Sequence, residues 1–292
     1  IEPAFFRNRQ LVLAYGVSFF SGILLMSVVF VPAFAELVLG LGKGASGYVV
    51  TPLALASAVG APLGGMLVDR RGARSTIALA LVAFAAGALL LVTWVDSLVT
   101  LIIALLVAGF GLGIVLGAPL NHLVLDQVDP ARTGSAVSVL SLHRSIGTTL
   151  GPSIMAVFMA SASRDLPAAM GGALGGVMQS YLSQHPDMAG PLMNLREQME
   201  ASSAASAGSS LDTSWLDQLA AVLPADLYGQ LDTAVRQVLK TTMEPAFEHM
   251  FLVGFIASLL ALVLALFLRR GSERPAGTVP AAGHEGTPST ED

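Results

Sequence analysis

Residues 65–74 read GMLVDRRGAR and form a short turn between two long apolar stretches, 44–68 and 75–95, that contain no Asp, Glu, Lys or Arg. A membrane-spanning helix needs about 20 mostly apolar residues, so both stretches are predicted transmembrane helices. The arginines of the turn follow the rule that Lys and Arg stay on the cytoplasmic side. That rule does not explain Asp69, since the dipole of a helix C-terminus disfavours an anion. Asp69 therefore needs a partner.

Four further stretches of the same kind lie on either side of this pair. They cover residues 10–35, 97–125, 133–163 and 249–268, and Arg144 is the one charged residue within them. Of the 292 residues, 54% are hydrophobic and 12% charged, whereas roughly 25% are charged in a soluble domain. A water-soluble globule is excluded. The predicted fold class is an all-α integral membrane protein with six transmembrane helices.

Composition also excludes several functional classes. The net charge of −5 and the scattered Lys and Arg residues argue against a nucleic-acid partner, and the absence of cysteine excludes disulfides and thiolate metal sites. The predicted helices contain no His-Glu cluster, no paired acids and no Ser-His-Asp set, so an enzyme is disfavoured. We expect no metal and no cofactor, and we expect membrane lipid and a small-molecule substrate as partners.

The distribution of basic residues predicts the topology. One arrangement places nine basic residues near helix ends on one membrane face, against Lys43 alone in the short loops opposite; the nine are Arg7, Arg9, Arg70, Arg71, Arg74, Arg132, Arg269, Arg270 and Arg274. Both ends of the chain are then cytoplasmic in a multi-pass protein of the cell membrane. Residues 1–160 hold the first five helices, 161–245 an extracellular, partly helical segment, 246–270 the last helix, and 271–292 a disordered cytoplasmic tail.

The long outer segment leaves one alternative open, a seventh span over residues 166–186. It contains four glycines, each of which costs roughly 1 kcal/mol of helix propensity, so we expect a surface or re-entrant helix instead. Leu227, Leu231, Val235 and Val238 recur at helical spacing and predict an amphipathic helix lying on the outer face. The chain begins at Ile1 without a leader, which is typical of a piece of a longer protein.

Small residues predict which helices face protein. In lipid, helices associate where glycines at four-residue spacing let their backbones approach, and prolines allow bending. The helices at 10–35, 44–68, 97–125 and 133–163 are expected in an inner layer, and those at 75–95 and 249–268 in an outer one. The residues expected at close contacts or bends are Gly60, Pro62, Gly64, Gly109, Gly113, Gly117, Pro119, Gly147, Gly151 and Pro152.

Polar and aromatic side chains within the spans predict the substrate side of the protein. A cation near the middle of a helix costs about 2.5–3.5 kcal/mol on insertion scales and is normally paired or solvated, which favours a functional role for Arg144 over snorkelling to the interface. The neighbouring His143 is expected to be a satisfied polar contact. Tyr15, Phe19 and Phe20 are expected to contact substrate, because serines and aromatic residues alternate in the first helix.

The turn motif Gly65, Asp69, Arg70, Gly72 and Arg74 resembles the signature loop of the major facilitator superfamily, which occurs between the second and third helices of each six-helix half. Two further strings, GFGLG at 109–113 leading to Pro119 and RSIGTTLG at 144–151, resemble the fourth and fifth helices of the C-terminal half in the fourteen-helix drug:proton antiporter branch. The resemblance covers nearly the whole chain and implies the C-terminal half of such a transporter.

The resemblance implies secondary active transport by alternating access, with the proton gradient as energy source and efflux of drugs or other hydrophobic or cationic compounds. It also implies that an N-terminal half supplies the proton-coupling acid, since no Asp or Glu lies inside the six predicted spans, and the partner of Asp69, with the 65–74 turn acting as a gating loop. An uptake symporter, a lipid or metabolite exporter, and a non-transporting scaffold that acts through its outer segment remain as alternatives.

Overall fold

The computed structural model describes residues 4–185 and 223–269, apart from the side chains of Ala4 and Lys43. Within these ranges the regular structure is entirely helical. The predicted tail, 271–292, and the central part of the outer segment lie outside the described residues.

Six helices of the described chain are long and apolar enough to cross a membrane, which confirms the six predicted spans and the all-α fold class. The first span is α2, η1 and α3 in succession, the second continues from α4 and η2 into α5, and the fourth is α7 followed by α8. In chain order the elements are α1 (Ala4–Arg7), α2 (Arg9–Ser27), η1 (Val28–Phe30), α3 (Val31–Leu37), α4 (Lys43–Ser46), η2 (Gly47–Val50), α5 (Thr51–Arg71), α6 (Ala73–Thr93), α7 (Leu98–Leu116), α8 (Ala118–Leu125), η3 (Pro130–Arg132), α9 (Thr133–Gln184) and α12 (Ala225–Leu266).

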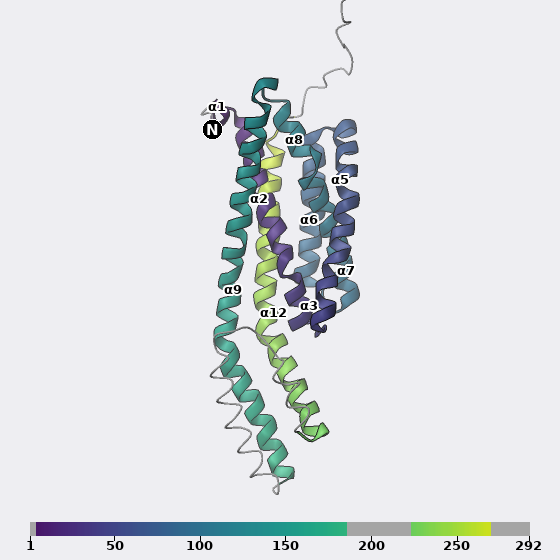
Figure 1. Ribbon diagram of the computed structural model, residues 1–292, viewed down its shortest axis with the longest axis vertical. Coiled ribbons are helices and arrows are strands. Elements are labelled where there is room, and N and C mark those ends of the chain that lie inside the picture. Colours follow the sequence, from purple (N-terminus) through teal and green to yellow (C-terminus); the bar gives the residue numbers. More distant parts are fainter. Residues whose placement is uncertain (1–3, 186–222, 270–292) are drawn as a thin grey trace, which may run out of the picture.

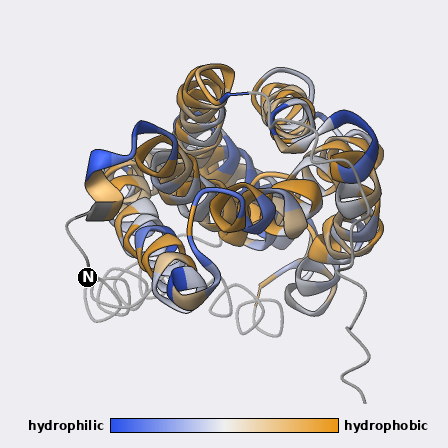
Figure 2. Ribbon diagram, turned by 90° about the horizontal axis from the view of Figure 1, so that it is seen from above, coloured by the Kyte–Doolittle hydropathy of each residue, from blue (hydrophilic) through white to orange (hydrophobic). Residues whose placement is uncertain are grey.

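The spans pack as two groups of three, seen side by side in Figure 1. In one group α2 packs against α9 and α12, and in the other α7 packs against α5 and α6; α12 and α6 join the groups. The first, second and third spans thus occupy places equivalent to those of the fourth, fifth and sixth. The first span pairs with the fifth through α2 and α9, and the fourth pairs with the second in the same way through α7 and α5. Such an internal repeat is common in transporters. Seen from above in Figure 2, stretches of ribbon coloured as hydrophobic lie on the outside of the bundle as well as inside it.

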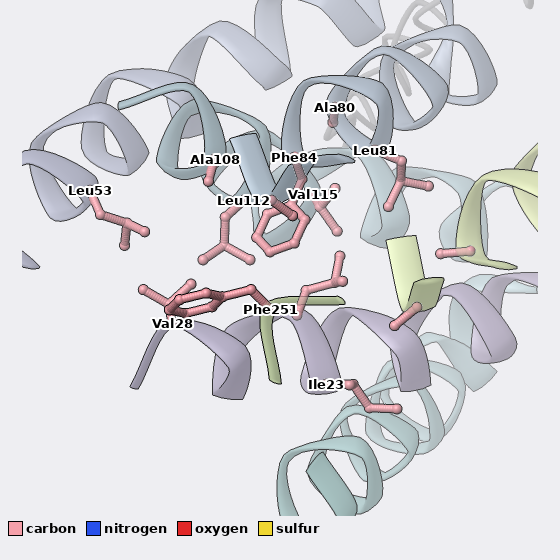
Figure 3. Close-up of a cluster of buried hydrophobic side chains, with 14 of the residues drawn as sticks. Ile23, Val28, Leu53, Ala80, Leu81, Phe84, Ala108, Leu112, Val115 and Phe251 are labelled. Atoms are coloured by element: carbon pink, nitrogen blue, oxygen red, sulfur yellow. The ribbon is translucent and has the colours of Figure 1, made fainter. Parts of the chain in front are cut away.

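The core lies where the two groups meet. Phe84 of α6 is 1% exposed and lies beside Leu112 and Val115 of α7, and Phe251 of α12 lies against Val28 (Figure 3). Lipid tails are as apolar as these side chains, so close packing rather than transfer from water holds the helices together.

The helices α9 and α12 extend well beyond the rest of the bundle (Figure 1). The 52 residues of α9 span about 78 Å, against roughly 30 Å for the hydrocarbon core of a bilayer. Their outer parts pack on each other through Met178, Tyr181, Leu227 and Leu231 in one cluster and through Val235 and Leu239 in another. They form an antiparallel pair, which we call the outer hairpin (residues 165–184 and 225–245).

The outer hairpin corrects two predictions. Residues 166–184 are not a separate surface or re-entrant helix, because α9 runs through them without a break. The amphipathic helix around Leu227 does not lie on the outer face; it is the first part of α12, and its apolar stripe is buried against α9. The stripe continues through Leu239 rather than Val238, which is only half-buried.

Of the three prolines expected at close contacts or bends, Pro119 lies beside a break in its span. The helices α5 and α9 continue through Pro62 and Pro152. The fourth span breaks at Gly117, one residue before α8 and two before Pro119, and the first span passes through the 3₁₀ turn η1. A 3₁₀ turn within a helix is often a hinge.

Candidate functional site

The turn between α5 and α6 is built around Gly72. Gly72 ends α5 with a φ of +80°, a backbone conformation that residues with a Cβ rarely adopt. The Gly72 amide donates to the Val68 carbonyl at 2.8 Å, and the Thr76 hydroxyl donates to the Gly72 carbonyl at 2.9 Å, which starts α6. The predicted gating loop is therefore a tight, well-hydrogen-bonded reversal.

Arg74 connects this turn to the last helix. Its Nη2 donates to the Leu266 carbonyl at 2.6 Å, in the final turn of α12. From the other side, Gln10 Oε1 accepts from the Arg269 amide at 2.7 Å, and the Arg9 guanidinium lies 6.0 Å from the centre of the Phe267 ring. The C-terminal carbonyls of a helix attract cations, so α2 and α6 together hold the end of α12.

Asp69 and Arg70 lie in the last turn of α5 with exposed side chains. Neither forms an ion pair or a side-chain hydrogen bond with any residue that the structure describes. Gly65 has room for a side chain, since a Cβ there would be no nearer than 4.0 Å to the Ala118 Cβ. Among the predicted gating-loop residues, Gly72 and Arg74 are thus the ones whose hydrogen bonds to other described residues hold the turn.

Glycines bring two helix pairs into backbone contact. A Cβ on Gly60 of α5 would lie 2.5 Å from the Phe110 carbonyl oxygen of α7, and one on Gly109 of α7 would lie 2.5 Å from that of Leu53. The remaining predicted glycines lie in the same two seams, Gly64, Gly113 and Gly117 between α5 and α7, and Gly147 and Gly151 between α9 and α2. Sequence reasoning missed Gly22 and Gly87, which also meet neighbouring backbone, because neither belongs to a four-residue glycine repeat on its own helix.

Burial within this chain does not follow the predicted division of the helices into an inner and an outer layer. Only 22% of the most apolar window of the spans containing α5 and α9 is buried, against 50% for α6. The glycine-bearing faces of α5 and α9 each pack on a single partner, α7 or α2, and no described element covers their opposite faces. We call these uncovered faces of α5 and α9 their bare faces.

The bare face of α9 is mixed in polarity. Ser141, Ser145, Thr149 and Ser153 form one row along it, and Leu142, Ile146, Leu150 and Ile154 form the adjacent row, with all eight side chains exposed. Three of the hydroxyls donate to carbonyls one turn earlier, at 2.9–3.2 Å, and retain lone pairs that can accept.

The exposed face of α12 differs from that of α9. Its exposed side chains within the span include Ile256, Leu260 and Val263, which are aliphatic, as expected for contact with lipid. The α9 face, with its row of hydroxyls, is suited to protein or water.

Arg144 lies beside this mixed face. Its side chain is half-buried, and its Nε is buried without a hydrogen-bond partner. The Arg144 backbone is in close contact with α2, since a Cβ on Gly22 would collide with the Arg144 carbonyl oxygen. Leaving a buried donor unpaired costs about 1–3 kcal/mol, more for a charged group. Arg144 is thus a cation within the apolar part of α9 that lacks a counter-ion among the described residues.

The three residues predicted to contact substrate lie in different surroundings. Phe19 and Phe20 are half-buried and meet edge to face, with ring centres 5.2 Å apart. Tyr15 is enclosed rather than facing an open surface, which corrects the prediction for it: it is 1% exposed, and its ring stacks on His143 at 5.1 Å. The serine and aromatic pattern of this helix therefore reflects contact with α9 at Tyr15.

A polar cavity of about 560 Å³ lies at the end of the bundle that carries the arginines. It opens between the start of α2 and the segment joining α8 to α9, and Asp126, Asp129 and Arg132 are among its lining residues. Sequence reasoning did not find it, because its walls come from two loops far apart in the chain.

Comparison with known proteins agrees with this architecture. The family model described as Major Facilitator Superfamily matches residues 2–152. The uncharacterized MFS-type transporter YfiU of Bacillus subtilis is 30% identical over 259 residues, covering 88% of this chain and 45% of YfiU. The multidrug transporter protein MdtP of Bacillus subtilis is 26% identical over 270 residues, covering 90% of this chain and 47% of MdtP.

A third relative matches a shorter part of the chain. The triacylglyceride transporter of Mycolicibacterium hassiacum is 34% identical over 164 residues, covering 52% of this chain and 30% of the relative. The chain spans less than half the length of each of these three proteins. It is a multi-pass membrane protein that belongs to the major facilitator superfamily, a family of transporters rather than enzymes.

Proposed function

We propose that the chain is the C-terminal six-helix half of a secondary active transporter that exports drugs or other hydrophobic or cationic compounds by alternating access, driven by the proton gradient. Family membership supports transport, and the name of one relative, the multidrug transporter protein MdtP, supports drug efflux. The span of less than half of YfiU and of MdtP supports a half-transporter.

The bare face of α9 carries the proposal. A face with a row of hydroxyls beside a row of aliphatic side chains is poorly suited to lipid and well suited to a cavity that takes amphiphilic compounds. Arg144 lies beside it without a counter-ion among the described residues. In the proposed transporter the N-terminal half covers part of α5 and α9, and the space between the halves holds the substrate against Phe19, Phe20 and Arg144.

Asp69 acts in this account as a cytoplasmic latch. Its carboxylate is exposed and unpaired within the described residues, although it lies in the last turn of a helix whose C-terminal dipole disfavours an anion. A cationic or helix-end partner in the N-terminal half would stabilise it in one access state. Arg74, which is committed to Leu266, holds the loop in place while the latch opens and closes.

The proposed topology places both ends of the chain in the cytoplasm and the outer hairpin outside the cell membrane. It is supported by the structure of the arginine-bearing end, where the start of α2, the Gly72 turn and the end of α12 meet. Residues 161–245 form the extracellular segment, continuous with α9 and α12 at its two ends.

The experiment that tests this function uses the full-length transporter in cells whose main efflux pumps are deleted. Cells are loaded with ethidium, a lipophilic cation, and its efflux is followed on energisation. The proposal predicts efflux that an uncoupler stops. Equal ethidium retention in cells with and without the transporter, or efflux that persists with the uncoupler present, would contradict it.

Export of a neutral lipid is a second candidate, favoured by the relative named as a triacylglyceride transporter. The aliphatic row from Leu142 to Ile154 would contact acyl chains. Transfer of a fluorescent triacylglyceride between vesicles by the purified transporter, without ethidium efflux in cells, would favour this candidate over drug export.

A further inference from the structure

His143 lies in the seam between α2 and α9 with one ring nitrogen fixed. Its Nδ1 lies 2.8 Å from the Val139 carbonyl oxygen. A carbonyl can only accept, so Nδ1 carries the hydrogen in this bond, and the neutral ring then has its lone pair on Nε2. That Nε2 makes no hydrogen bond within the described residues. The ring is therefore held in the tautomer that leaves one basic nitrogen open.

Tyr15 supplies a second, independent observation. Its ring lies parallel to the imidazole, with centres 5.1 Å apart and planes 14° apart, and Phe6 lies near both rings. A protonated imidazole above a tyrosine ring at this separation forms a cation–π pair. The Tyr15 hydroxyl is buried without a hydrogen-bond partner, although phenylalanine would fill the same space. The stacked tyrosine ring therefore holds the imidazole in one orientation.

The position of His143 within the bundle is also informative. It lies ten residues into α9, or about 15 Å from the helix start, inside the apolar part of the span. The helices α2, α7 and α8 contain no Asp or Glu, and the acids of α9 and α12, from Asp165 to Glu248, lie in or next to the outer hairpin. Within the bundle, the charged or titratable groups on the elements packed around His143 are Arg144 on α9, Arg7 on α1, Arg9 and Tyr15 on α2, His122 and Asp126 at α8, and Arg132 on η3. Between His249 and Arg269, α12 has none.

We propose that His143 is a proton-binding site of the transport cycle and that Tyr15 is its positioning residue. In one access state Nε2 takes a proton from water, giving an imidazolium that keeps its Nδ1 bond to Val139 and lies over the Tyr15 ring. In the other state Nε2 returns the proton to water, and the neutral tautomer is restored. The stacked Tyr15 ring holds the imidazole in place in both states. This inference rests on the proposed proton-driven transport.

The chain contains a matched control for this site. His249 has the same local arrangement, with Nδ1 2.5 Å from the Pro245 carbonyl oxygen and its ring stacked on Phe158 at 5.5 Å and 12°. It is exposed and lies near the outer hairpin rather than within the apolar seam. Asparagine at either position retains a donor in the place of Nδ1 and removes Nε2.

The experiment compares H143N, H249N and Y15L in the full-length transporter, reconstituted in proteoliposomes with ethidium as the transported probe. Two rates are measured for each, accumulation of ethidium driven by an imposed pH gradient and exchange of ethidium without a gradient, across a series of pH values. H143N is expected to lose gradient-driven accumulation and the pH dependence of transport while exchange continues. Y15L removes the stacked ring and is expected to slow accumulation only, and H249N is expected to match the wild type.

Three results would overturn the inference. A wild-type pH profile in H143N would remove His143 from the proton path, and loss of exchange together with accumulation would make its role structural. Equal losses in H143N and H249N would show an effect of imidazole removal in general. Absence of gradient-driven accumulation in the wild type would instead contradict the proposed proton coupling itself, so the two failures are distinguishable.

Discussion

The guanidinium of Arg74 donates a hydrogen bond to the carbonyl of Leu266 at 2.6 Å, which joins the start of α6 to the end of α12 across 192 residues of chain. The same end of α12 is held from the other side by Gln10 through the Arg269 amide. The turn predicted to act as a gating loop is thus anchored to the last helix through one of its arginines, while Asp69 and Arg70 remain available to another part of the protein.

Arg74→Ala should therefore destabilise the protein while Arg70→Ala should not. Loss of a hydrogen bond to a helix-end carbonyl costs about 1 kcal/mol, whereas Arg70 has an exposed side chain and no partner among the described residues. The melting temperature of the purified full-length transporter in detergent measures the difference. Equal melting temperatures for the two variants would show that the Arg74 bond does not hold the loop.

Asp69→Asn should impair efflux while leaving membrane insertion intact. The substitution removes the charge that the proposed latch needs and changes no contact within the described residues. Asp96→Asn is the control, because Asp96 is also exposed and lies in the connection between α6 and α7, at the opposite end from the Gly72 turn. Efflux at the wild-type rate in Asp69→Asn, at equal membrane abundance, would refute the latch.

Gly60→Ala should lower stability, and Gly65→Ala should be neutral. A Cβ at position 60 would lie 2.5 Å from the Phe110 carbonyl oxygen and would force α5 and α7 apart, at a cost of about 1–3 kcal/mol. At position 65 of the same helix the nearest atom would be 4.0 Å away. Thermal unfolding of the two variants side by side tests the helix contact, and a stable Gly60→Ala would place the seam elsewhere.

Arg144→Ala should abolish efflux, whereas deletion of residues 201–218, which lie outside the described part of the chain, should leave it largely intact. The transporter account locates function between the helices, beside the mixed face of α9. A scaffold that acts through its outer segment requires the reverse. Arg164→Ala is the matched control for Arg144→Ala, since it removes an exposed arginine from the same helix, beyond the bundle. Ethidium efflux from cells with equal amounts of each variant decides between the two.

The spans and the presence of close helix contacts at glycines were predictable from the sequence because both depend on local properties. A helix in lipid needs a sufficient length without charge, and repeated glycines at positions such as Gly60 and Gly109 allow only close backbone contact. The tight turn at Gly72 was likewise visible, since the motif places a glycine between two helices.

The remaining features depend on contacts between distant parts of the chain. Weak helix formers at 171–176 argued against a continuous α9, but α9 continues through them and packs on Leu227 and Leu231 of α12, so tertiary packing overrides propensity. Tyr15 was expected to face substrate because its helix is polar on one side, yet the stacking partner His143 comes from α9. The bond between Arg74 and Leu266 could not be read from either segment alone.

The most direct test of the account is the sidedness of the Gly72 turn. Single cysteines are introduced at Arg71, beside the turn, and at Gly171, on the outer hairpin, in a full-length transporter freed of other cysteines. Intact cells are then treated with a membrane-impermeant maleimide. The account predicts labelling at position 171 from the medium and labelling at position 71 only after the membrane is opened. Labelling of position 71 in intact cells would contradict it.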